Sequence, residues 1–234
     1  NDESRNHPTY YKMWAGIDEN SDRKPTFAEN LTYFFRYQVN HMYWRYFMWN
    51  FAGRQNDIQS HGLNLSGNEP TNVSNGTKDL LHGNWITGID FIDELRLGPQ
   101  DNLPNDLANN AGKNKLFCLP LLLGLAGLIF HIKKSPKDSF VVFLLFFMTG
   151  LAIVLYLNQP PAQPRERDYA YAGSFYAFAI WIGLGVYALY EWTKKIKKIP
   201  DSVRAGILGV ICLFAVPVLM ASEEWDDHDR SGRY

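Results

Sequence analysis

Two charged clusters combine residue types and spacing that could do chemistry. The first, Arg165-Glu166-Arg167-Asp168, lies within the stretch NQPPAQPRERDYAYAGSF. The forked guanidinium of arginine suits bidentate contact with phosphate, so Arg165 and Arg167 are candidates to bind a phosphate group, such as that of a lipid. The alternative is that these arginines pair with Glu166 or Asp168 and hold the loop in shape.

The second cluster is EEWDDHDR, residues 223–230, with five carboxylates and one histidine. Oxygen-rich clusters suit hard divalent cations, so a divalent metal is conceivable here. The weak candidates for metal ligands are Asp226, Asp227, His228 and Asp229. We predict no metal site, because the cluster is better explained as the solvated acidic start of an outward region. The sequence contains no GxSxG, HExxH, Walker or GxGxxG pattern.

The elements that must position these clusters include four long apolar stretches. One of them, FVVFLLFFMTGLAIVLYL, carries no charge at all. Because about 20 apolar residues cross the roughly 30 Å hydrocarbon core of a bilayer, we predict an all-α, polytopic membrane helical bundle. Its four transmembrane helices are expected at 116–132, 140–157, 174–192 and 205–221. The alternative is four buried helices of a soluble bundle.

Small residues within these stretches are expected to let helices approach closely. They are Gly124, Gly127, Gly183, Gly185, Gly206 and Gly209. Cys118 and Cys212 lie in the same apolar stretches and are interpreted as small buried hydrophobes.

The charges of the short loops predict an orientation. Lysines concentrate between the first and second stretches and between the third and fourth, at Lys133, Lys134, Lys137, Lys194, Lys195, Lys197 and Lys198. Since positively charged loops remain cytoplasmic, residues 1–115, 158–173 and 222–234 are expected on the opposite side of the membrane. A net charge of −1 argues against nucleic acid as a partner.

The outward region 1–115 is predicted to contain one long aromatic helix over 26–52. Thr26 and Glu29 have the spacing of a capping box, and Gly53 is a natural stop. Gln38, His41 and Arg45 form a polar line along the helix, which favours an interfacial or cavity-lining position; a helix packed within a soluble core is the alternative. Residues 54–115 form an irregular polar loop region with one short helix expected at 88–98.

Four long segments of the sequence resemble a known family. They are HMYWRYFMWNFAGRQNDIQ, GNWITGIDFIDELRLG, NQPPAQPRERDYAYAGSFYAFAIWIGLG and DDHDRSGRY. The chain resembles the DUF2723 membrane proteins of Bacteroidetes, which are similar to TMEM260-like protein O-mannosyltransferases and are grouped with GT-C type glycosyltransferases. The resemblance implies that the chain is a central fragment of a longer inner-membrane protein.

The resemblance also implies partners and roles. A polyprenyl-phosphate sugar would be the sugar donor, and the fragment itself would hold no cofactor. The sugar would be transferred on the periplasmic side to an acceptor, for which a protein is a candidate. Membrane lipid and the rest of the full-length chain would be further partners. It places Arg165, Arg167, His41 and Arg45 at the donor lipid phosphate. The acceptor-side candidates are Arg54, Gln55, Asn56 and Asp57.

One departure leaves catalysis open. The acidic W-D-C-G-E motif of the family's early outward loop is absent from this sequence. A non-catalytic membrane scaffold or assembly subunit of a larger envelope complex is therefore the alternative function. A transporter fragment is disfavoured, because the centres of the apolar stretches carry little ionisable content.

Overall fold

The computed structural model describes residues 7–18, 20–64, 77–100, 103–162, 164–194 and 199–228, with side chains described to residue 225. These residues are mostly helical. The polar region contains α1 (His7–Ala15), α4 (Asp90–Leu97) and α5 (Asn105–Ala108). The predicted short helix at 88–98 is confirmed as α4.

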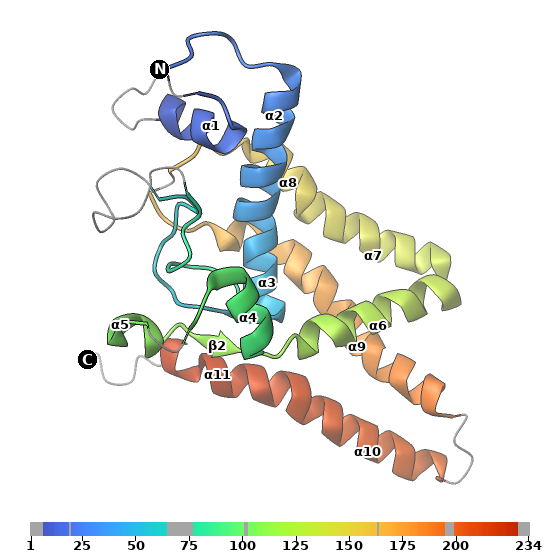
Figure 1. Cartoon of the computed structure of the whole chain (residues 1–234). Coiled ribbons are helices and arrows are strands. Elements are labelled where there is room, and N and C mark those ends of the chain that lie inside the picture. The colour runs from blue at the N-terminus through green and yellow to red at the C-terminus, as the bar shows by residue number, and fades with distance from the viewer. Residues whose placement is uncertain are drawn as a thin grey trace.

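The apolar half of the chain forms a helical bundle (Figure 1). A long helix built from α2 (Phe27–Tyr33), η2 (Phe34–Trp44) and α3 (Arg45–Phe51) crosses one end of the bundle, and α1, α4 and α5 lie beyond that end. The bundle comprises α6 (Leu119–Lys134), α7 (Pro136–Thr149), α8 (Leu151–Leu157), η3 (Asp168–Tyr171), α9 (Ala172–Thr193), α10 (Asp201–Leu213), η4 (Phe214–Val218) and α11 (Leu219–His228).

Three continuous helical segments of the described chain are long and apolar enough to cross a membrane: Pro136–Leu157, Asp168–Thr193 and Asp201–Trp225. The prediction of four such helices is wrong for the first. Phe117 and Cys118 adopt positive φ angles of 52° and 54°, so α6 begins only at Leu119 and has 16 residues. At 1.5 Å per residue it is about 24 Å long, short of the roughly 30 Å hydrocarbon core.

The connections between these helices alternate between the two ends of the bundle. The α6–α7 turn, the C-terminal end of α9 and the start of α10 lie at one end, and the segment between α8 and α9 lies at the other (Figure 1). This is the alternation expected from the lysine-rich loops. Lys195, Lys197 and Lys198 fall outside the described residues.

The long helix begins and ends where the sequence predicts. Thr26 caps α2 (Phe27–Tyr33), and Glu29 completes a capping box; α3 (Arg45–Phe51) stops just before Gly53. Between them, η2 (Phe34–Trp44) is a π-helix, which the sequence analysis did not predict. Its hydrogen bonds run between residues five apart, as from Arg45 N to Asn40 O, so residues five apart come close to one face.

The aromatic side chains of this helix form the core that joins it to the bundle. Tyr43 and Phe47 pack on Phe146 of α7 and Phe175 of α9, and Phe47 also contacts Phe178. Burial of large aromatic side chains is a principal source of packing free energy. The helix therefore fixes the end of the bundle to the polar region, while its position relative to a lipid interface stays a prediction.

Close backbone contact joins α6 to α9. A Cβ atom on Gly127 would lie 1.8 Å from Trp181 O, and one on Gly185 would lie 2.1 Å from Leu123 O. Gly124 likewise faces the Phe178 ring, whereas Gly183, Gly206 and Gly209 face open space. The glycine prediction is confirmed for three of its six positions.

A small two-stranded ladder ties the polar region to the end of the long helix. β1 (Gly53–Arg54) pairs antiparallel with β2 (Asn114–Lys115), and Trp85 forms an isolated bridge with Arg54. The loop region 54–115 thus returns to the point where it left the helix, directly before the bundle begins.

Candidate functional site

The segment between α8 and α9 lies along the long helix and is attached to it by side chains of that helix. The Tyr33 hydroxyl donates to Gln159 O at 2.9 Å, and the Tyr37 hydroxyl donates to Pro160 O at 3.0 Å. Gln38 Nε2 donates to Asn158 Oδ1 at 2.9 Å. We call residues 158–167 the hairpin segment. Its first residues are held mainly through main-chain oxygens.

Glu166 anchors the other end of the hairpin segment. Its carboxylate accepts from Arg45 Nη2 at 2.7 Å and Nη1 at 3.2 Å, and from Ser60 N at 3.2 Å. The Tyr46 hydroxyl donates to the same carboxylate and accepts from Arg167 N at 3.3 Å. Glu166 therefore joins the hairpin segment, the long helix and the loop that follows it.

The electrostatics of this junction keep Glu166 ionised. Burial alone would raise the pKa of its carboxyl, but the Arg45 guanidinium and the hydrogen bonds from Tyr46 and Ser60 outweigh burial and lower it. The remaining donors of Arg45 bind His41 O at 3.0 Å and Gly83 O at 3.1 Å. Glu166 is thus a structural anion and is a poor general acid at neutral pH.

This pairing leaves the two flanking arginines without a carboxylate partner among the described residues. Arg165 is exposed, with its guanidinium 5.8 Å from the Tyr169 ring centroid and Nη2 3.4 Å from the Tyr169 hydroxyl. Arg167 Nε is buried without a hydrogen-bond partner in the described structure. The loop-holding alternative applies to Glu166, whose partner comes from the helix instead of from Arg165 or Arg167.

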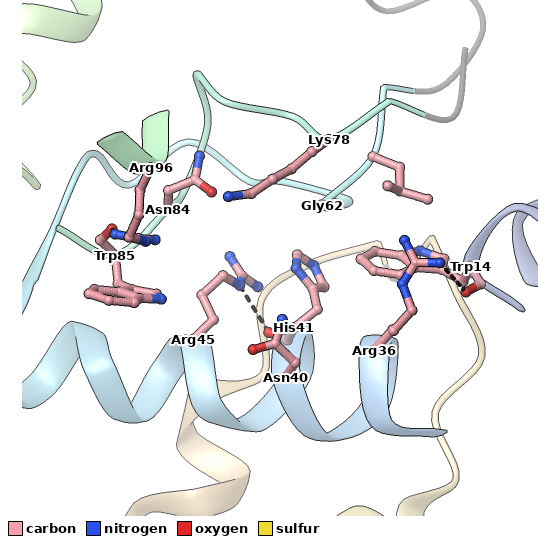
Figure 2. A pocket seen from close by; sticks show the side chains of 11 residues that line it. Trp14, Arg36, Asn40, His41, Arg45, Gly62, Lys78, Asn84, Trp85 and Arg96 are labelled. Carbon is pink, nitrogen blue, oxygen red and sulfur yellow. Dashed lines mark hydrogen bonds between the residues drawn. The ribbon is translucent and has the colours of Figure 1, made fainter. Parts of the chain in front are cut away.

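The other two predicted donor-site residues, His41 and Arg45, line a cavity of about 240 Å³ on the polar side of the long helix. Figure 2 shows Arg36, His41 and Arg45 rising from the helix, with Arg36 beside Trp14, while Lys78 reaches in from the opposite segment with its amine near Asn84. Arg165 and Arg167 do not line this cavity. The four predicted residues are therefore divided between two places, which the Arg45–Glu166 pair connects.

His41 is a neutral group in the cavity wall. Burial lowers the pKa of its imidazole well below the usual value, and the neighbouring Arg45 charge lowers it further. Gly62 packs directly against it: with φ at +74°, a Cβ atom there would lie 2.6 Å from His41 Nδ1. A glycine is needed at this position both for its backbone conformation and for the space.

The predicted acceptor-side residues bind mainly to the chain itself. Arg54 Nε donates to Gly112 O at 2.7 Å, Gln55 Nε2 donates to Leu80 O at 3.0 Å and Asn56 Nδ2 donates to Leu81 O at 2.8 Å. Gln55 and Asn56 are fully buried, whereas Asp57 is exposed. The first three shape the loop region, and an acceptor role for the set stays a prediction.

The weak metal candidates lie at the end of the described chain. Asp226, Asp227 and His228 are helical, in α11, but their side chains are not described, and Asp229 lies outside the described residues. Among the residues that are described, no group of three or more His, Cys, Asp or Glu side chains could hold a metal ion.

Several cavity residues escaped the sequence analysis, chiefly Arg36, Lys78 and Arg96 with Trp14 and Trp85. At the α-helical angle of 100° per residue, Arg36 falls on a different side from His41 and Arg45. The π-helix brings them to one face. The run FFRYQVNHMYWR offers no pattern that announces this change of pitch.

Comparisons with family models, curated proteins and solved structures returned no match for this chain. Its function must therefore be argued from the fold and the two charged places just described.

Proposed function

We propose that this chain is part of the membrane core of a polyprenyl-phosphate-sugar-dependent glycosyltransferase, similar to protein O-mannosyltransferases and acting on the periplasmic side of the bacterial inner membrane. The observation that carries the proposal is the state of the hairpin segment. Glu166 is paired with Arg45, which leaves Arg165 and Arg167 without a carboxylate partner among the described residues, directly before the apolar segment Asp168–Thr193. The resemblance to the DUF2723 family supports the same assignment.

In this proposal Arg165 and Arg167 bind the phosphate of the lipid-linked donor. They precede the apolar segment Asp168–Thr193, so a phosphate bound here could have its hydrocarbon chain beside the bundle. In this proposal Arg45 is not given a direct phosphate contact, because four of its five N–H donors bind Glu166, His41 O and Gly83 O. Its role is to position the hairpin segment, and His41 packs beside it.

The test is sugar transfer by the full-length protein from a labelled polyprenyl-phosphate sugar. Replacing both arginines, Arg165→Gln with Arg167→Gln, removes two charge-assisted contacts and should lower transfer by about 100-fold or more. Lys24→Gln with Lys137→Gln removes two exposed charges away from the hairpin segment and should leave transfer unchanged. Unaltered transfer by the hairpin variant would rule out this donor site.

A non-catalytic membrane scaffold is the second candidate. It is favoured by the absence of the family's acidic motif from the sequence and by the structural use of Glu166, the carboxylate nearest the two arginines in sequence. The same assay separates the two candidates, since a scaffold would show no transfer with any donor while the full-length protein remains folded and membrane-embedded.

A further inference from the structure

The cavity on the polar side of the long helix is a second positively charged site, separate from Arg165 and Arg167 of the hairpin segment. Among the described residues, its wall contains four basic side chains and no carboxylate. The cations come from two segments that face each other across the space: Arg36 and Arg45 on the helix, Lys78 and Arg96 on the loop region (Figure 2). Trp14, Asn40, Asn84 and Trp85 complete much of the remaining wall.

Three of these cations have no ion pair with a described residue. Arg45 is neutralised by Glu166, but Arg36 has only the Trp14 carbonyl, at 3.3 Å from Nη1. Arg96 donates to Trp85 O at 2.8 Å, and its guanidinium lies 3.3 Å from the Trp85 ring centroid. Burial lowers the pKa of Lys78, and the Arg96 charge lowers it further, so like charges are crowded here. A bound anion would relieve that crowding.

The wall chemistry fits a phosphate group that carries a polar substituent. Arginine forks suit phosphate oxygens, and a lysine adds a further point charge. The amide of Asn40 can donate and accept, as hydroxyl groups require, and Trp85 offers an aromatic surface. Asn84 offers only its Oδ1 as an acceptor, because its Nδ2 already donates to Gln55 Oε1, Asp79 O and His82 O. A carboxylate would satisfy fewer of these donors.

The position of the cavity favours a ligand from water over a lipid. Arg36 and Arg45 face the polar loop region, whereas Tyr43 and Phe47 of the same helix pack against α7 and α9. The helix and its aromatic core therefore stand between the cavity and the apolar bundle. We propose that this cavity is a binding site for a water-soluble phosphate monoester, with the phosphate bound by Lys78 and Arg96.

The test measures binding to the full chain in detergent by calorimetry at constant ionic strength, with glucose 1-phosphate and inorganic phosphate as probes. Saturable binding is expected for both probes and none for glucose. Lys78→Gln should weaken binding about tenfold or more, the change typical of losing a hydrogen bond to a charged group. The Lys78 side chain remains partly in solvent at the mouth of the cavity, so the variant should fold; circular dichroism checks this.

Two controls make the result specific. Lys24→Gln removes an exposed lysine away from the cavity and should leave binding unchanged. Arg165→Gln with Arg167→Gln should also bind the probes normally, so the outcome is independent of the proposed transfer reaction. The proposal is overturned by no binding at millimolar probe, by normal binding to the Lys78→Gln variant, or by binding to phosphatidic acid vesicles alone.

Discussion

At the scale of single residues, the pairing of Glu166 determines which charges of the run 165–168 are left for a ligand. The sequence shows two arginines around one glutamate, and local pairing is the simplest arrangement of such a run. The structure pairs the glutamate with Arg45, 121 residues earlier, and with Tyr46 and Ser60. The guanidinium groups of Arg165 and Arg167 are consequently not ion-paired with the Glu166 carboxylate that lies between them in the sequence.

The variant Glu166→Gln tests this role. It leaves the Arg45 guanidinium buried without its counter-ion, which typically costs about 3–5 kcal/mol of folding free energy. The folded-state pKa of Glu166 is lowered, so its stabilisation is present above the ordinary glutamate pKa and is lost as pH falls below it. The variant should therefore unfold at a lower temperature than the unaltered protein at pH 7. Its unfolding temperature should also fall less than that of the unaltered protein when the pH is lowered.

Thermal unfolding in detergent, followed at pH 7 and at pH 4, measures both effects. Lys194→Gln is the matched control, because the Lys194–Glu191 pair lies largely in solvent and should contribute little. An unchanged midpoint for Glu166→Gln at pH 7 would show that the junction does not hold the hairpin segment.

At the scale of elements, the long helix was predictable in extent but not in pitch. Its capping box and its stop before Gly53 follow from local residue types, which act within one turn of the chain. The π-helical part, Phe34–Trp44, depends on what packs around it. Sequence periodicity alone could therefore place Gln38, His41 and Arg45 on one polar line but could not bring Arg36 to the same cavity.

The α6–α9 pair offers a test at this scale. Gly185→Ala places a methyl group 2.1 Å from the Leu123 carbonyl oxygen, so one helix backbone must move. Overpacking of this kind costs about 1–3 kcal/mol, and the upper end applies because the obstacle is main chain. Gly183→Ala, two residues earlier in the same helix, meets nothing within 4 Å and is the control.

Thermal unfolding in detergent should show a lowered midpoint for the Gly185 variant and an unchanged or raised midpoint for the Gly183 variant. Equal midpoints for the two would mean that α6 and α9 do not pack backbone against backbone in the folded protein.

At the scale of the whole molecule, the apolar stretches were visible because a bilayer demands length and apolarity, which a sequence displays directly. The missing fourth span has a local cause, the left-handed turn at Phe117 and Cys118, which no composition reveals. The candidate site was harder. Arg165 and Arg167 stand out in the sequence, whereas the cavity cations come from segments that only the tertiary fold brings together.

The arrangement of the apolar segment Pro136–Leu157 makes a topological prediction. Its two ends lie at opposite ends of the bundle, so cysteines introduced at Lys137 and Ala162 should face opposite sides of the membrane. In a background without Cys118 and Cys212, a membrane-impermeant maleimide applied to intact cells should label Ala162→Cys alone. Labelling of both positions from the same side would exclude a span between them.

The tyrosine contacts to the hairpin segment also bear on how this chain can vary. Tyr33 and Tyr37 donate hydrogen bonds to main-chain carbonyl oxygens, which every amino acid possesses. These bonds therefore depend on the position of the backbone and not on the type of side chain at the bonded residue. Exchanges at Pro160 should accordingly be better tolerated than insertions or deletions, which would shift each oxygen away from its hydroxyl. Among natural variants, the length of the hairpin segment is therefore expected to vary less than its amino-acid sequence.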